Sequence, residues 1–173
     1  MKIFDCTTFF KEKMMMDIRF NILDEYVSKF IVVESKFTHS GKKKELNFSK
    51  NDFPKFKEKI KHIIIEKEPE GLINDENLLK NSYYKRLNSL KRIEQSYEYM
   101  FLGLDGANED DLILLSDNDE IPDLSEVLNK GIKNNFILFK QLFFYYKFNL
   151  LYDRIKWFGT KGCKKKKLKN FSS

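Results

Sequence analysis

Short apolar runs alternate with longer stretches of helical spacing along the chain. The runs are five or six residues long and are rich in Ile, Val, Leu and Phe, which is typical of buried β-strands. This alternation predicts an α/β domain whose central sheet is mainly parallel. The expected strands are residues 2–6, 30–34, 60–65, 111–116, 136–140 and 143–148.

Two helices and a short third one are expected between these strands. Apolar residues recur every four positions between the first two strands, so one helical face can pack on the sheet. These residues are Ile18, Ile22, Tyr26 and Phe30. The longest helix is expected over about residues 77–102, with Gly103 at its C-terminal cap. A short helix is expected after Asp123, which would cap it, and ends at Gly131.

The composition is typical of a folded domain and argues against a nucleic-acid partner. With 173 residues, 42% of them hydrophobic, and 17 Phe, the chain can bury a core. The formal charge is +6, but six Lys in residues 161–173 supply it, which leaves 26 basic and 26 acidic residues over 1–160. Arg, whose guanidinium binds phosphates and bases through two parallel hydrogen bonds, is scarce. We therefore predict one domain over 1–160 and a disordered Lys-rich tail over 161–173.

Cysteine spacing and hydropathy indicate a cytoplasmic protein. Cys6 and Cys163 are far apart and lack metal-ligand spacing, so Cys6 is expected to be a buried thiol. No run approaches the ~18 apolar residues of a membrane helix, and Asp5 interrupts the start of the chain where a signal peptide needs its apolar core. We therefore expect no transmembrane segment, and at most a weak peripheral contact of the Lys tail with an anionic membrane.

The segment with the clearest chemistry is DDLILLSDNDEIPD at residues 110–123. Its apolar strand ends in three closely spaced carboxylates, Asp117, Asp119 and Glu120. Ligands of open α/β sheets bind at the carboxyl ends of the strands. Carboxylates crowded there repel one another, and a divalent cation would relieve the repulsion while gaining hard oxygen ligands. Many nucleotide-sugar transferases use an Asp-x-Asp after a buried strand to hold the metal on the donor diphosphate.

Two other interpretations of this segment stay open. Asp117 and Asp119 could be solvated residues of a turn that caps the next helix, although the apolar strand before them and Ile121-Pro122 after them favour a site. The motif is also found in haloacid-dehalogenase-type phosphatases, where the first Asp is the nucleophile and the second the general acid. Those enzymes usually carry it on their first strand and need further residues downstream, whereas only 50 residues follow Asp123 here.

Four motifs together carry a family resemblance over about residues 2–162. The first consists of Asp5, Phe9, Phe10, Glu12, Asp17, Ile18 and Arg19, and the second of Glu34, Thr38, Gly41 and Lys42. The third consists of Ser116, Asp117, Asp119, Glu120, Ile121 and Pro122. The last, an aromatic strand followed by Trp-x-Gly-Thr, consists of Phe144, Tyr145, Tyr146, Asn149, Trp157, Gly159 and Thr160. In this order and spacing the chain resembles glycosyltransferase family 17, the family of β-1,4-mannosyl-glycoprotein 4-β-N-acetylglucosaminyltransferase.

The resemblance implies a GT-A-like (Rossmann-like) domain that binds a nucleotide-diphosphate sugar. It implies a metal-dependent, inverting glycosyltransferase that moves N-acetylglucosamine from UDP-N-acetylglucosamine to a glycan acceptor. Asp117 and Asp119 would hold Mn²⁺ or Mg²⁺ on the donor diphosphate. The other expected donor contacts are Asp5, Thr7, Glu34 and Arg92, for which a turn cap, an ion pair or a solvated helix face are the structural alternatives.

An inverting transfer also needs a carboxylate that takes the proton of the acceptor hydroxyl. Glu120 and Asp123 are the two candidates. His39, in the family-like turn, is a candidate ligand contact, whereas His62, within a strand, is expected to be structural. The aromatic run at 143–148 is expected mainly in the core, with one face available to line the acceptor cleft.

The chain departs from the family pattern at two places. Family members usually have Gln-Arg shortly before Gly103, where this chain has Ser96-Tyr97, and Arg92 with Glu94 could stand in for them. Members also continue well beyond the Trp-x-Gly-Thr, so a truncated copy is expected. A non-catalytic remnant that binds a nucleotide sugar without transferring it is therefore the alternative function.

Overall fold

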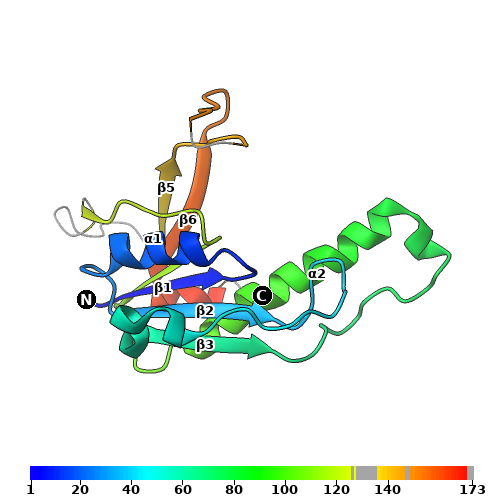
Figure 1. Ribbon diagram of the computed structural model, residues 1–173, viewed down its shortest axis with the longest axis horizontal. Coiled ribbons are helices and arrows are strands. Elements are labelled where there is room, and N and C mark those ends of the chain that lie inside the picture. The colour runs from blue at the N-terminus through cyan, green and yellow to red at the C-terminus, as the bar shows by residue number, and fades with distance from the viewer. Residues whose placement is uncertain (126, 128–135, 147–148, 171–173) are drawn as a thin grey trace.

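One sheet organises the described part of the chain (Figure 1). The computed structural model describes residues 1–125, 127, 136–146 and 149–170. The strand order is β3-β2-β1-β4-β6-β5, with β1 to β4 parallel and β6 antiparallel to both of its neighbours. The bounds are β1 (Ile3–Thr8), β2 (Lys29–Ser35), β3 (Ile60–Ile65), β4 (Leu112–Ser116), β5 (Phe136–Gln141) and β6 (Trp157–Lys164). The sheet is therefore mostly parallel, and the predicted α/β class is confirmed.

The parallel strands bury apolar side chains on both faces. Because alternate residues of a strand point to opposite faces, Phe30 and Val32 belong to one core and Ile31 and Val33 to the other. The first core lies under α1 (Lys13–Leu23), and the second is covered by the C-terminal end of α2 (Ser82–Met100). Because both faces are buried, the sequences of these strands are continuous apolar runs.

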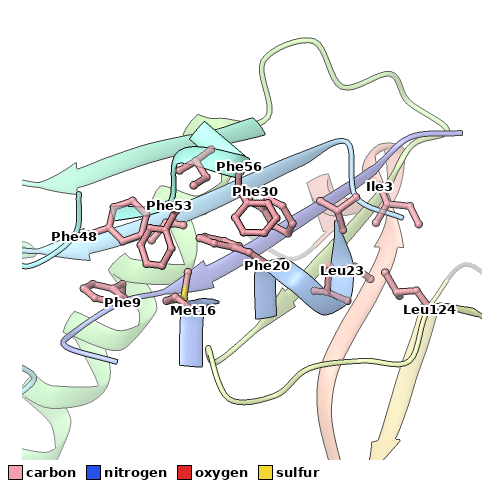
Figure 2. Packing of buried hydrophobic residues seen from close by; sticks show 14 of the residues in the cluster. Ile3, Phe9, Met16, Phe20, Leu23, Phe30, Phe48, Phe53, Phe56 and Leu124 are labelled. Atoms are coloured by element: carbon pink, nitrogen blue, oxygen red, sulfur yellow. The ribbon is translucent and has the colours of Figure 1, made fainter. Parts of the chain in front are cut away.

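Short 3₁₀ helices complete the described elements. They are η1 (Lys50–Asp52), η2 (Pro54–Lys59), η3 (Leu78–Lys80), η4 (Phe101–Gly103) and η5 (Lys165–Asn170). Phe53, between η1 and η2, and Phe56, within η2, pack on Phe20 of α1, with ring centroids 5.1 and 5.5 Å away (Figure 2). Phe30 of β2 completes the cluster, with its ring 4.6 Å from that of Phe20. An aromatic cluster thus joins α1 to the sheet.

The face of α1 that packs on the sheet differs from the predicted one. Ile18 and Ile22 are 39% and 51% exposed, whereas Met16, Phe20 and Leu23 are fully buried. Since an α-helix turns by about 100° per residue, positions two apart lie on nearly opposite sides. The four-residue recurrence of Ile18 and Ile22 therefore marks the solvent face, and the prediction was wrong because two apolar stripes run along this helix.

The predicted strands at 2–6, 30–34, 60–65, 111–116 and 136–140 are confirmed, with small shifts at their ends. The strand expected at 143–148 is wrong for its described part, which holds only an isolated bridge between Phe144 and Leu151. Residues 147–148 lie outside the described part. β6 was not predicted, because its glycines and lysines break the apolar pattern of a strand.

The disordered tail expected from Lys161 onward is corrected up to residue 170. Residues 161–164 belong to β6, which pairs with β4, and η5 follows. Cys163 and Leu168 are buried in the core that α2 covers. The aliphatic part of a lysine side chain can lie along the surface while neighbouring small or apolar residues face inward. A high lysine content alone therefore does not indicate disorder.

Gly103 follows α2, as predicted, but its backbone angle is not of the left-handed type. Its role is close packing, since a Cβ there would lie 2.5 Å from Cγ2 of Ile31. We expect Gly103→Ala to destabilise the fold by about 1–3 kcal/mol through overpacking, measured by urea unfolding. In an Ile31→Ala background the same substitution should cost less than half as much; an equal cost in both backgrounds would contradict this origin.

The β5–β6 pair projects from the sheet as an arm (Figure 1). In the segment that connects its two strands many large apolar side chains are exposed, among them Leu142, Tyr145, Tyr146 and Leu150. The helix expected after Asp123 begins as predicted, because Asp123 Oδ1 accepts the backbone N–H of Ser125 at 3.0 Å. Its continuation to Gly131 lies outside the described residues.

No helix within the described ranges is long and apolar enough to cross a membrane.

Candidate functional site

A cavity of about 610 Å³ opens at the carboxyl ends of β1, β2 and β4. The strand register brings these ends together, because Thr7 pairs with Val32 on one side and with Ser116 on the other. The volume is typical of pockets that hold small ligands, roughly 300–1,000 Å³. The cavity is lined by Thr8, Phe9, Phe10, Glu12, Val33, Ser35, Phe37, Thr38, His39, Ser40, Lys44, Arg92, Ser96, Asp117, Asn118 and Asp119.

Residues 117–120, here called the acidic turn, border this cavity, and residues 117–119 form part of its wall. The turn closes with a backbone hydrogen bond of 3.2 Å from Glu120 N to Asp117 O. Asp117 and Asp119 are exposed, and both line the cavity. Tyr97 of α2 donates its hydroxyl to Asp117 Oδ1 at 3.2 Å. Burial, and then the charge of Asp117, raise the pKa of Tyr97, so the phenol remains a neutral donor.

Arg19 lies behind the acidic turn and is fully buried. Its Nε and Nη2 donate to Asp5 Oδ2 and Oδ1 at 2.8 and 2.6 Å. Nη2 also donates to Ser116 Oγ at 2.6 Å, and Nη1 donates to three carbonyl oxygens of the acidic turn. A guanidinium on the inward face of α1 therefore binds the first strand and the turn after the fourth.

This geometry corrects the expected donor contacts on β1. Asp5 is fully buried, and both its carboxylate oxygens accept from Arg19, so the side chain faces away from the cavity. Thr7 is also buried, and the neighbouring Thr8 lines the cavity instead. The sequence motif placed these residues at the correct end of the strand, but only the packing shows which of them are accessible.

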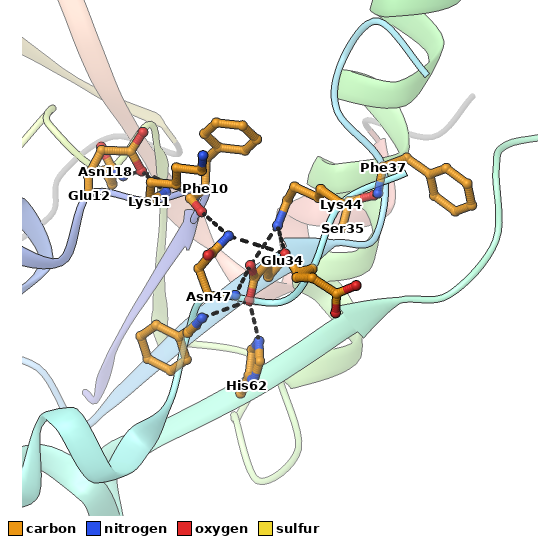
Figure 3. Close-up of polar contacts among 12 residues, drawn as sticks. Phe10, Lys11, Glu12, Glu34, Ser35, Phe37, Lys44, Asn47, His62 and Asn118 are labelled. Atoms are coloured by element: carbon orange, nitrogen blue, oxygen red, sulfur yellow. Dashed lines mark hydrogen bonds and ion pairs between the residues drawn. The ribbon is translucent and has the colours of Figure 1, made fainter. Parts of the chain in front are cut away.

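Glu34 is likewise a structural carboxylate (Figure 3). It is fully buried, with Lys44 Nζ 2.6 Å and the backbone N of Asn47 2.7 Å from its Oε1. Its Oε2 accepts the N–H of Phe48 at 3.0 Å and lies 3.5 Å from Nε2 of His62. Burial alone would raise the pKa of Glu34, but these contacts outweigh it and lower the pKa to about 2. The expected donor contact of Glu34 is therefore corrected, and His62, which was expected to be structural, lies beside this buried carboxylate.

A second carboxylate connects the start of α1 to the acidic turn (Figure 3). Oε2 of Glu12 accepts the backbone N–H groups of Phe10 and Lys11 at 3.1 and 2.9 Å. The same oxygen accepts Nδ2 of Asn118, between the two aspartates, at 3.0 Å. Burial opposes ionisation of Glu12, but the hydrogen bonds outweigh it and lower its pKa. Glu12 is thus held ionised at the cavity wall.

Arg92 lines the cavity, and its contact with a donor phosphate stays a prediction. Its guanidinium makes two hydrogen bonds with Glu68, at 2.6 and 3.1 Å, and donates to the carbonyl oxygen of His39 at 3.2 Å. His39 itself lines the cavity and is exposed. Arg92 therefore supports the loop after β2 and offers the cavity a charge already balanced by Glu68.

Neither predicted catalytic base lines the cavity. Glu120 accepts the N–H of Asp117 at 3.1 Å and Nε1 of Trp157 at 3.0 Å. Burial, followed by the nearby charge of Asp117, raises its pKa against the effect of these hydrogen bonds. Asp123 caps Ser125 on the surface, and this hydrogen bond lowers its pKa. The two candidates thus support the acidic turn and the following helix.

Two residues of the Trp-x-Gly-Thr motif at the start of β6 donate hydrogen bonds to Glu120. Trp157 binds the Glu120 carboxylate, and Thr160 Oγ1 donates to its carbonyl oxygen at 2.6 Å. Gly159 between them lets the strand approach, since a Cβ there would lie 2.8 Å from Cδ of Glu120. The motif therefore fixes the end of the acidic turn.

Sequence reasoning missed Tyr97, Lys44 and the part that Arg19 plays. From the sequence, Arg19 is a residue of the first motif and a candidate ion-pair partner of Glu34, whereas the structure pairs it with Asp5. An Arg on an otherwise apolar helix face already indicates a buried partner. Tyr97 stands in the sequence only as a departure from the family pattern. Its spacing from the acidic turn carries no local signal, because α2 reaches the turn only through the tertiary fold.

Asp117 and Asp119 are carboxylates of the cavity wall that have no ion-pair partner among the described residues, and Glu12, held by hydrogen bonds alone, is a third. Lys44 and Arg92 of the same wall are paired with Glu34 and Glu68. No group of three His, Cys, Asp or Glu side chains within the described ranges is close enough to hold a metal ion by itself. A cation at these aspartates would therefore take its remaining oxygen ligands from water or from a bound molecule.

The fold and the site define an α/β protein with a Rossmann-like sheet and an acidic ligand cavity at the carboxyl ends of its parallel strands. A comparison with protein-family models matches residues 1–169 to Glycosyltransferase family 17. The chain belongs to this family, so the predicted resemblance is confirmed and the protein is assigned to the glycosyltransferases. A search of curated proteins found no match.

Proposed function

We propose that this chain is a metal-dependent, inverting glycosyltransferase with a GT-A-like domain, and that the cavity binds UDP-N-acetylglucosamine as the donor for a glycan acceptor. The observation that carries the proposal is the pair of exposed aspartates, Asp117 and Asp119, on the wall of the cavity at the end of β4. Family membership supplies the reaction class.

The donor set of the cavity suits Mn²⁺ or Mg²⁺. Such ions are commonly bound through one or two carboxylates together with substrate phosphates, which is the number of free carboxylates that Asp117 and Asp119 provide. When bound, the cation supplies charge neutralisation for the diphosphate and for the departing nucleotide. Tyr97 restrains Asp117 through Oδ1, which leaves Oδ2 as its available oxygen.

The charge balance explains why the metal would be required. A nucleotide diphosphate is an anion, and it would meet the negative charges of Asp117 and Asp119 at close range. The nearest basic residues on the cavity wall, Lys44 and Arg92, are each neutralised by a carboxylate of their own. The diphosphate is therefore expected to bind weakly unless a cation accompanies it.

Calorimetric titration with UDP and UDP-N-acetylglucosamine, with and without Mn²⁺, tests this proposal. We expect binding that depends on the metal and weakens about 10- to 100-fold in Asp119→Asn, the loss typical of a charged interaction. Asp110→Asn is the matched control, because Asp110 is an exposed acid just before the same strand and is paired with Lys164 and Lys166. Metal-independent binding, or equal losses in both variants, would reject the donor site.

A second candidate is a protein that binds the nucleotide sugar without transferring the sugar. The observation that favours it is the position of Glu120 and Asp123, neither of which lines the cavity. Assays of donor hydrolysis and of transfer to glycan acceptors separate the two functions, since only the enzyme releases UDP. The phosphatase alternative is not proposed, because the family is one of glycosyltransferases.

A further inference from the structure

The acidic turn is connected to the rest of the fold by a buried guanidinium. Arg19 is fully buried, and each of its side-chain nitrogens donates at least one hydrogen bond. Nη1 points into the turn and lies 3.1 Å from the carbonyl oxygen of Asp117 and 3.2 Å from those of Asn118 and Glu120. One nitrogen therefore binds three of the four carbonyl oxygens of the acidic turn.

Such a convergence of carbonyl oxygens is unfavourable without a cation among them, because buried carbonyl groups need donors and their dipoles repel one another when they point together. The burial of Arg19 is in turn compensated by Asp5, whose two oxygens accept Nε and Nη2. A buried charge without such a partner is strongly destabilising. The two residues therefore form one unit that crosses from β1 and α1 to the end of β4.

We infer that Arg19 is a positioning residue for the donor site, and this inference rests on the proposed function. It contacts only the backbone of Asp117 and leaves the carboxylates of Asp117 and Asp119 on the cavity side. By fixing the carbonyl directions, it determines where these two carboxylates point. Groups that orient metal ligands from behind typically change metal affinity 10- to 100-fold when they are altered.

A lysine at position 19 would keep the positive charge but could not form the same set of hydrogen bonds. Arg presents five donors in a rigid planar fork, whereas the ammonium of Lys is a compact point with three donors. In Arg19→Lys, one ammonium would have to serve Asp5, Ser116 and the carbonyl oxygens of the turn. We expect the pair with Asp5 to persist and the carbonyl contacts to loosen, so the fold survives while the turn loses its fixed geometry.

The test is a titration of Mn²⁺ into the full chain with a fixed concentration of UDP, read by calorimetry and by the electron paramagnetic resonance signal of free Mn²⁺. The Mn²⁺ concentration that gives half-maximal binding is expected to rise 10- to 100-fold in Arg19→Lys. Circular dichroism and urea unfolding establish that the variant is folded under these conditions. A half-maximal Mn²⁺ concentration within twofold of the wild-type value would overturn the inference.

Two further variants separate positioning from general loss of stability. Phe56→Leu lies in the same core but contacts no residue of the acidic turn, so it should lower stability and leave the Mn²⁺ requirement unchanged. If Arg19→Lys does not fold, Ser116→Ala removes a single acceptor of Nη2 and should still raise the Mn²⁺ requirement. An unchanged Mn²⁺ requirement in Ser116→Ala, or an equal rise of this requirement in Phe56→Leu, would contradict the positioning role of Arg19. Absence of Mn²⁺-dependent binding in the wild type would instead refute the proposed function.

Discussion

Phe20→Ala is expected to destabilise the protein by about 3–5 kcal/mol, the typical cost of truncating a buried Phe. Phe20 is fully buried and has three ring neighbours: Phe30 on β2, Phe53 between η1 and η2, and Phe56 within η2. Its removal leaves a cavity among these rings (Figure 2). Because small domains have only about 5–15 kcal/mol of stability, the loss is large.

Urea unfolding followed by circular dichroism measures this effect, and Ile22→Ala on the same helix is its control. Ile22 is 51% exposed, and surface substitutions usually stay within about 0.5 kcal/mol. The comparison also tests the orientation of α1, since the four-residue recurrence predicted Ile22 on the buried face. Equal losses in the two variants would mean that the helix packs with the predicted face.

Glu34 is expected to make the fold sensitive to acid. Its pKa of about 2 lies below the ordinary value of 4.5, so the folded state favours the carboxylate. The resulting stability is complete above pH 4.5 and is lost as the pH falls toward 2. Since one pKa unit corresponds to 1.36 kcal/mol, the full contribution is about 3 kcal/mol, of which about 2 kcal/mol is gone by pH 3.

Glu34→Gln tests this contribution directly. The variant should lose on the order of 3 kcal/mol at neutral pH, because Lys44 is then buried without its carboxylate. Its unfolding free energy should also fall less than that of the wild type between pH 6 and pH 3. Glu66→Gln is the control, since Glu66 forms an exposed pair with Lys36, and such pairs contribute little. An unchanged pH dependence in Glu34→Gln would refute the assignment.

Much of the fold follows from local pattern. Strands buried on both faces need continuous apolar runs, and such runs predicted β1, β2, β3 and β4 and the parallel sheet. Local pattern failed at β6, where Gly159 and Gly162 serve close approach to neighbouring residues and so interrupt the apolar sequence. It failed again at residues 161–168, where the lysines flank the buried residues Gly162, Cys163 and Leu168. In both places the partner that explains the sequence lies far away along the chain.

The candidate site divides in the same way. The acidic turn could be identified from sequence, because an apolar strand followed by Asp117-Asn118-Asp119 places two carboxylates at a strand end whatever the rest of the fold. Motif membership alone could not distinguish residues that face the cavity from residues that support it. Asp5 and Arg19 belong to the same motif as Phe10 and Glu12, yet the first pair is buried and the second lines the cavity.

The chain's own order of residues thus decided the class of fold, the family and the position of the acidic turn, because each depends on neighbours within a few residues. Tertiary structure decided the buried face of α1, the pairing of Arg19 with Asp5 and that of Glu34 with Lys44. It also brought Tyr97 to the acidic turn. These features depend on which surfaces meet when distant segments pack. That packing decides which charged side chains are buried as supports and which remain accessible at the cavity.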